Sequence, residues 1–188
     1  YNPLLCLEAN SSFLWDAELR AGNASPWESS PALLDTSFAT VPPDIRELRF
    51  RADAGFGFQP VLQELEDHDV RYAVVARLTT PLKNALRGLN YQRANARWEL
   101  AETEYRAHGW SHARRIVAAR RLIESEDAHT TLFATGRYLY RAWTTNLPLT
   151  PAGVWHFYEG RAGMEPRIRE LREDFALRKI PTASFEAN

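Results

Sequence analysis

The chain has 188 residues, of which 45% are hydrophobic and 25% are charged, and its formal net charge at pH 7 is −1. This is the size of one domain, or of one domain with an insertion, and the composition excludes a disordered, collagen-like or disulfide-rich chain. The single cysteine, Cys6, has no partner for an internal disulfide, which favours a reducing compartment. No apolar run approaches the roughly 18 residues of a membrane span, and no signal peptide is recognisable.

Both ends of the sequence are abrupt. Residues 1–3 lead directly into an apolar run without a start methionine, and residues 184–188 stop without a recognisable terminal element. We therefore expect the 188 residues to be an excised piece of a longer protein.

The first part of the chain is expected to alternate strands and helices. Two apolar segments separated by turn residues predict a hairpin of residues 4–7 and 13–20. The elements expected after it are a short helix within 31–40, a strand at 45–52, a helix at 60–67 and a strand at 72–78. This alternation is typical of an α/β fold.

The middle of the chain changes character after residue 80. A short helix is expected at 82–89, and segments rich in Val, Ile, Tyr, Trp and Thr then predict strands at 98–106, 113–123 and 130–145, with turns at Gly109 and Gly136. Residues 80–143 therefore form a mostly β insertion in this interpretation.

The last part of the chain is predicted to be helical. Thr150 is a good capping residue and Pro151 suits the first helical position. An apolar stripe at helical spacing follows, formed by Val154, Phe157, Met164, Ile168, Leu171 and Phe175. Pro166 interrupts this stripe, so it either kinks the helix or begins a second one.

One pattern on this predicted helix places polar and charged side chains together. It reads Tyr-x2-Arg-x3-Glu-x6-Arg and is formed by Tyr158, Arg161, Glu165 and Arg172. At about 100° per residue, the four positions fall within an arc of about 60° beside the apolar stripe, where a carboxylate is held rigidly and still reaches a ligand. The same spacing also gives Arg–Glu pairs on a solvated face, and spacing alone favours that simpler interpretation.

A second candidate residue is Asp53, which comes directly after a predicted strand and is followed closely by Gly55. Ligand sites of open α/β sheets form at the carboxyl ends of strands, so Asp53 is a candidate metal ligand. An Asp in a turn that bonds its own backbone is an equally good interpretation.

A third candidate is a basic strip between residues 105 and 123, which contains no Asp or Glu. Guanidinium groups suit phosphate contacts, and an aromatic ring can stack on a base. The predicted DNA contacts of this strip are Arg114, Arg115, Arg120, Arg121 and Trp110. Trp98 and Trp143 are also near in sequence, and the alternative that these tryptophans belong to the core is slightly favoured.

Four segments, taken in order, resemble the DDE transposases of bacterial insertion sequences, in the branch with a Tyr-Arg-Glu-Lys signature. They are residues 19–24 (Leu-Arg-Ala-Gly-Asn-Ala), 51–56 (Arg-Ala-Asp-Ala-Gly-Phe), 144–147 (Thr-Thr-Asn-Leu) and the pattern that begins at Tyr158. The resemblance covers nearly the whole chain. It implies a ribonuclease-H-like core divided into residues 1–79, a mostly β insertion at 80–143, and the last strand end with the catalytic helix at 144–188.

The resemblance also implies the chemistry of DNA strand cleavage and strand transfer. In it, two divalent ions, Mg²⁺ or Mn²⁺, lie about 4 Å apart between carboxylates, activate water or a 3′-hydroxyl and stabilise the leaving oxygen. Asp53 would be the second acid of the triad and Glu165 the third. Tyr158, Arg161 and Arg172 would contact phosphates of double-stranded DNA at transposon ends. A homodimer in the complete protein, a location at the bacterial nucleoid and no membrane association are also implied.

Two departures from the family pattern stand out. Arg172 takes the place of the usual Lys, which keeps the charge and changes the geometry. The first catalytic Asp belongs on a strand before residue 4, and Asp16 comes too late to replace it. We therefore expect residues 1–188 alone neither to cleave nor to join DNA. A nuclease of the same core without strand transfer, a non-catalytic DNA-binding remnant, and a plain α/β domain are the alternatives.

Overall fold

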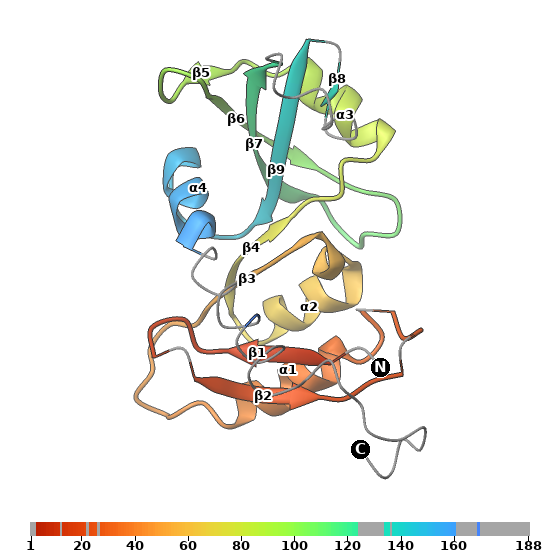
Figure 1. The fold of residues 1–188 in the computed structure, drawn as a ribbon, viewed down its shortest axis with the longest axis vertical. Coiled ribbons are helices and arrows are strands. Elements are labelled where there is room, and N and C mark those ends of the chain that lie inside the picture. Colours follow the sequence, from red (N-terminus) through yellow and green to blue (C-terminus); the bar gives the residue numbers. More distant parts are fainter. Residues whose placement is uncertain are drawn as a thin grey trace. The chain divides into compact units, whose positions relative to one another are not determined.

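A computed structural model of the protein describes residues 3–11, 13–21, 23–25, 27–123, 134–135, 137–160 and 169. The chain divides into two compact units (Figure 1). The first is formed by Tyr1–Arg46 with Glu159–Asn188, and the second by Glu47–Tyr158.

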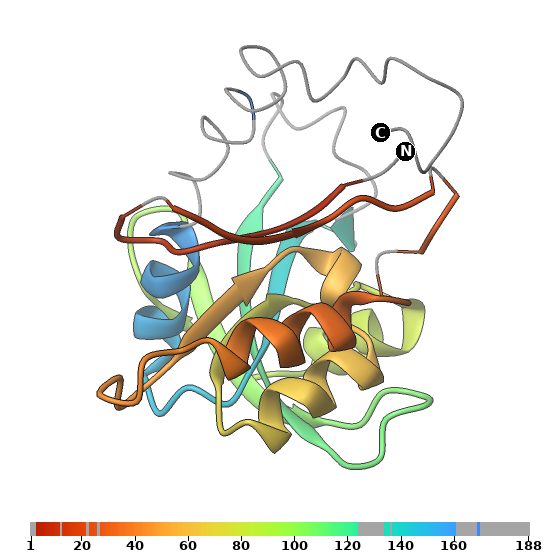
Figure 2. The same ribbon diagram turned by 90° about the horizontal axis from the view of Figure 1, so that it is seen from below.

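The described residues 3–46 of the first unit form an antiparallel hairpin and a helix. Strand β1 (Leu4–Leu7) pairs with β2 (Leu14–Glu18), as the two red strands of Figure 2 show, and helix α1 spans Ser30–Ala39. Asp16 on β2 accepts hydrogen bonds from the hydroxyls of Thr36 (3.3 Å) and Ser37 (3.1 Å) on α1. Asp16 therefore joins the hairpin to the helix, which is a structural role and agrees with its exclusion from the predicted acidic triad.

The second unit is built on a mixed sheet. Among the described residues the sheet has seven strands in the order β3–β4–β9–β7–β6–β5, with β8 paired to β9. Of the strand pairs described, β3 with β4 is parallel and the others are antiparallel. The strands are β3 (Arg49–Ala52), β4 (Arg71–Val75), β5 (Gln92–Arg93), β6 (Glu99–Tyr105), β7 (Arg114–Leu122), β8 (Ala134–Thr135) and β9 (Tyr138–Thr145).

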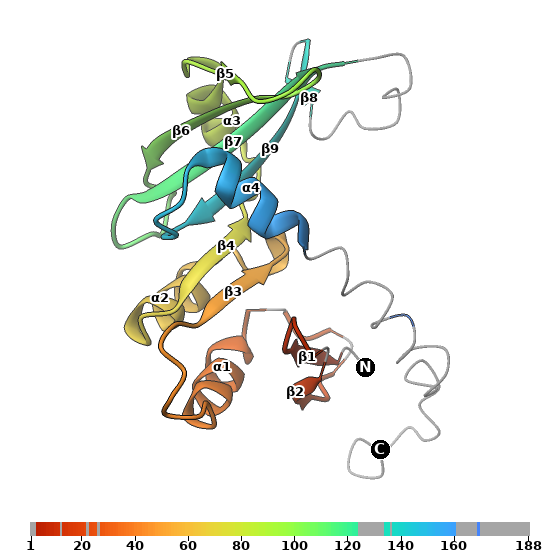
Figure 3. The same ribbon diagram turned by 90° about the vertical axis from the view of Figure 1, so that its left-hand side faces the viewer.

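Helices cover both faces of this sheet. Helices α3 (Thr80–Arg87) and α4 (Pro151–Glu159) lie on opposite sides of β7 and β9 (Figure 3). Alternate residues of a strand point to opposite faces, so β7 contributes Ile116 to the core under α3 and Val117 to the core under α4. Helix α2 (Gln59–Asp67) buries three apolar side chains, and a 3₁₀ helix at Ala54–Phe56 precedes it.

Most of the predicted elements are confirmed, with shifted ends. The mixed α/β class is confirmed as well, and the three-part division of the chain stays a prediction. The strand region expected at 130–145, with a turn at Gly136, contains β8 and β9, and a turn at Arg137 lies between them. The short strand β5 and the 3₁₀ helix were not predicted, since each spans three residues or fewer. The turn at Gly136 and the interruption at Pro166 lie outside the described residues.

Candidate functional site

Asp53 lies directly after β3, at the carboxyl end of the parallel pair. Its backbone is extended, its side chain is exposed, and its Oδ1 accepts a hydrogen bond from the Gly55 amide at 2.9 Å. The turn passes close to the end of β4, because a Cβ on Gly57 would lie 3.2 Å from the Val75 carbonyl oxygen. The turn interpretation is therefore confirmed, and the same turn orients the carboxylate at the edge where sheet ligands bind.

Tyr158 lies in the last turn of α4 and packs on the sheet. Its ring lies 5.7 Å from the ring of Trp143, which is buried on β9. Trp143 pairs with Val75, and Val74 pairs with Ala52, the residue before Asp53. The last turn of α4 therefore reaches the level of the sheet at which Asp53 lies.

The segment that leads into α4 is fixed to β4 by side chains. Asn146 donates a hydrogen bond from Nδ2 to the Val70 carbonyl (2.9 Å) and accepts one from the Tyr72 amide at Oδ1 (2.7 Å). Thr145 donates its hydroxyl to the Tyr72 carbonyl at 2.6 Å. The Asn146 side chain thus takes the place of a strand backbone, which gives the Thr-Thr-Asn-Leu segment a structural role.

Arg115 is predicted to contact DNA and is engaged within the protein. It donates hydrogen bonds to the carbonyl oxygens of Leu147 (2.7 Å) and Leu149 (2.8 Å), and it forms an ion pair with Glu102 on β6. Thr150 then begins α4 by accepting a hydrogen bond from the Gly153 amide at 3.2 Å. In this structure Arg115 therefore holds the loop that starts α4.

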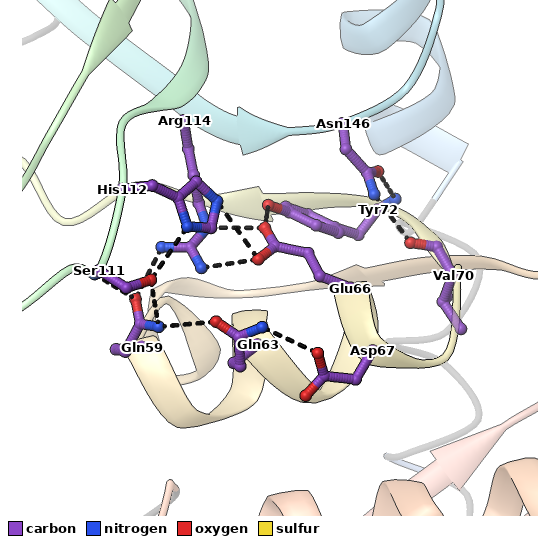
Figure 4. Close-up of polar contacts among 10 residues, drawn as sticks. All are labelled: Gln59, Gln63, Glu66, Asp67, Val70, Tyr72, Ser111, His112, Arg114 and Asn146. Carbon is purple, nitrogen blue, oxygen red and sulfur yellow. Dashed lines mark hydrogen bonds and ion pairs between the residues drawn. The ribbon is translucent and has the colours of Figure 1, made fainter.

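Arg114 does not fit the predicted role of a DNA contact, because its side chain is only 2% exposed. Two of its nitrogens bond both carboxylate oxygens of Glu66, at 2.7 and 2.8 Å, and the third donates to Gln59 at 2.8 Å (Figure 4). Its guanidinium also lies over the ring of Trp110, 5.1 Å from the centroid. Arg114 and Trp110 therefore belong to a network that joins α2 to β7.

The electrostatics of this network centre on Glu66. Burial alone would raise the pKa of Glu66, but hydrogen bonds from Arg114 and Tyr72 and the nearby charge of Arg114 outweigh it, so the pKa lies below its usual value. Burial, together with the hydrogen bond to Glu66, raises the pKa of the Tyr72 hydroxyl. The Nε2 atom of His112 lies 3.5 Å from a carboxylate oxygen of Glu66 (Figure 4). The Nδ1 atom of His112 shares a hydrogen bond with the Ser111 hydroxyl. Both oxygens of the Glu66 carboxylate are bonded by Arg114, so we assign this cluster a structural role.

Arg120 and Arg121 point to opposite faces of β7. Arg120 lies between the rings of Tyr91 and Tyr138, 3.9 and 4.4 Å from their centroids, and is paired with Glu99 at 2.8 Å. Arg121 lies over the ring of Trp98 at 5.5 Å. Strand register therefore separates two neighbouring arginines that the basic strip had grouped together.

Arg141 on β9 was missed by the sequence analysis. It is exposed and lies 5.2 Å from the centroid of Trp98, so Trp98 carries two guanidinium groups, from Arg121 and Arg141. Arg141 comes close to Arg121 because β7 and β9 pair in a register that places Ala119 opposite Arg141. A search for clusters of charge along the sequence cannot detect this proximity. Of the three tryptophans considered, Trp143 is confirmed as a core residue at 2% exposure.

The remaining predicted site residues, Arg161, Glu165 and Arg172, lie outside the described residues. The part of the chain that the structure describes contains no helix long and apolar enough to cross a membrane.

A mixed sheet with an acidic residue at the end of its parallel pair is compatible with the ribonuclease-H-like domains of transposases. The family described as transposase DDE domain, group 1, matches residues 1–188, and the chain belongs to this family. The chain is thereby assigned to the transposases and to DNA transposition. Transposase domains of this kind generally depend on divalent metal ions. No curated protein matches the chain.

Proposed function

We propose that the chain carries the catalytic acids Asp53 and Glu165 of a transposase that cleaves DNA strands and transfers them by phosphodiester transesterification. The observation that supports this most is the position of Asp53, at the carboxyl end of β3 and level with the last turn of α4. Glu165 follows Tyr158 by seven residues in the sequence, and its assignment rests on the family pattern that begins at Tyr158.

The donor set fits a divalent cation. Asp53 is exposed and offers carboxylate oxygens, which hard cations prefer, and the Gly55 amide orients this carboxylate. Divalent ions bound there would supply the activation of the attacking hydroxyl and the stabilisation of the leaving oxygen. In this proposal Asp53 and Glu165 hold the ions, and Tyr158, Arg161 and Arg172 bind the DNA phosphates beside them.

Metal binding tests the proposal directly. We expect the 188-residue chain to bind Mn²⁺, and we expect Asp53→Asn and Glu165→Gln each to abolish that binding, because each removes a charged oxygen ligand. Asp67→Asn is the matched control, since Asp67 accepts a hydrogen bond from Gln63 on α2 away from Asp53. Calorimetric titration is the measurement. Wild-type affinity in both site variants, or no binding by the unmodified chain, would contradict a metal site built on these two acids.

We further propose that the face around Trp98 contacts the DNA backbone. Arg121 and Arg141 place two positive charges over one ring, on the side of the sheet that α4 covers. Arg115, Arg120 and Trp110 remain proposed contacts as well, although Arg115 and Arg120 are also paired with Glu102 and Glu99 within the protein.

The salt dependence of DNA binding tests this face. The double variant Arg121→Gln/Arg141→Gln is expected to reduce the slope of log K against log salt by about two units, because two phosphate contacts are lost. Arg49→Gln/Arg87→Gln removes the same charge from two exposed positions elsewhere and serves as the control. Equal slopes for the two double variants would show that only net charge matters.

A further inference from the structure

Arg51 makes a contact between β3 and α4 that the proposed mechanism does not yet use. Its Nη1 donates a hydrogen bond to the Phe157 carbonyl oxygen at 2.8 Å, and its guanidinium lies over the Phe157 ring, 5.3 Å from the centroid. The two residues are 106 positions apart in the sequence. One side chain therefore ties the first strand of the sheet to the last helix of the unit.

The contact of Arg51 is made near the last described residues of α4. Phe157 lies among the last described residues of α4 (Pro151–Glu159). Arg51 bonds the carbonyl oxygen of this residue from a neighbouring strand, so it fixes this part of α4 to β3.

The place of Arg51 on the strand is equally informative. It lies two residues before Asp53, and the backbone of Asp53 is extended. Side chains alternate along extended chain, so positions 51 and 53 point to the same side of the sheet. Arg51 contacts α4, and that side is therefore the one that α4 covers. Asp53 lies two residues after Arg51, and Tyr158 lies directly after Phe157, the residue that Arg51 contacts.

We propose that Arg51 is a positioning residue for Asp53: through its bond to α4 it fixes the end of the strand that presents this carboxylate. This inference rests on the proposed function, because it presumes that Asp53 binds metal. Arg51 itself carries a positive charge and is not a ligand. Its contribution comes from fixing the geometry between the strand and the helix.

The test compares Mn²⁺ affinity and backbone hydrogen exchange in variants of the 188-residue chain. Arg51→Gln is expected to weaken Mn²⁺ binding about tenfold, the lower range for loss of a residue that orients metal ligands. Arg51→Lys keeps the charge and one donor and loses the stacked plane, so we expect it to restore part of the affinity. Arg49→Gln is the matched control, because Arg49 lies on the same strand and is paired with Glu47.

Hydrogen exchange supplies the second measurement. The last described residues of α4 are expected to exchange faster in Arg51→Gln than in Arg49→Gln, because they lose their bond to β3. Faster exchange together with weaker Mn²⁺ binding in Arg51→Gln, and partial rescue in Arg51→Lys, would support the positioning role. If Arg51→Gln fails to fold, the comparison of Arg51→Lys with the unmodified chain decides the question by the same two readouts.

Three results would overturn this role. Loss of Mn²⁺ binding in Asp53→Asn with unchanged affinity in both Arg51 variants would leave the proposed function intact and remove Arg51 from it. Equal weakening by Arg49→Gln would reduce the effect to net charge. Absence of Mn²⁺ binding by the unmodified chain would overturn the metal site itself and the positioning role with it.

Discussion

At the scale of single residues, the ion pair of Glu66 and Arg114 gives a specific prediction about stability. Arg114 is almost fully buried, so Glu66→Gln would leave its charge without a counter-ion. We expect the free energy of unfolding to fall by about 3 kcal/mol, the lower end for breaking a buried pair, because Glu66 keeps 19% of its side chain exposed. Urea unfolding of the wild type and the variant measures this difference in the free energy of unfolding. Glu64→Gln, on the same helix and paired with His68, is expected to cost less than about 1 kcal/mol.

The same pair gives stability a pH dependence of known sign. Because the pKa of Glu66 is lower in the folded chain than its usual 4.5, the ionised group stabilises the fold fully above that value. This contribution is lost as the pH falls through the folded-state pKa. The difference in unfolding free energy between wild type and Glu66→Gln should therefore shrink on acidification. A difference that stays constant at every pH below 4.5 at which the chain still folds would exclude this origin.

The arginines also show how far a sequence can assign residue roles. Arg114 and Arg121 belong to one basic strip, yet one is enclosed by α2 and the other lies beside Trp98. Strand alternation predicts that they face opposite sides, but burial depends on which helix covers each side. Arg51 and Arg141 were missed for the same reason, since their partners lie on elements distant in the sequence.

At the scale of elements, Asn146 joins β9 and α4 to β4. Asn146→Ala would leave the Val70 carbonyl and the Tyr72 amide without these partners, and we expect a loss of about 2 kcal/mol in unfolding free energy. Denaturant unfolding, with hydrogen exchange at Tyr72, measures the effect. Asn84→Ala on the exposed side of α3 is the control, because Asn84 makes only a long contact of 3.3 Å with Arg87 among the hydrogen bonds described. Similar losses in both variants would show that the bonds of Asn146 are not special.

Sequence patterns located the elements well and their ends less well. The strand expected from residue 45 begins at Arg49, although the Leu48 carbonyl already accepts a hydrogen bond from the Arg71 amide of β4 at 2.9 Å. Asp53 was located correctly after this strand, since a polar residue that ends an apolar run is a local signal. Its alignment with the end of α4 depends on strand register, which no local signal contains.

At the scale of the whole molecule, the second unit has the features of an independent folding unit. Its sheet carries a buried cluster on each face, and the members of both clusters lie between residues 47 and 158. We therefore expect the excised residues 47–158 to unfold in one cooperative transition, with tryptophan fluorescence and circular dichroism giving the same midpoint. Separate midpoints for the two probes would show that this unit needs the rest of the chain.

The order of strands in the sheet has a consequence for folding kinetics. Strands β6 and β7 are close in sequence and pair along the whole length of β6, so their pairing closes a short loop. Strand β4 reaches the sheet only by pairing with β9, and β3 in turn pairs only with β4 among the described strands. Contacts between distant segments form slowly because the entropy of loop closure opposes them. The strand that presents Asp53 is therefore expected to join the sheet last, so the acidic site is assembled only when the rest of the unit is already folded.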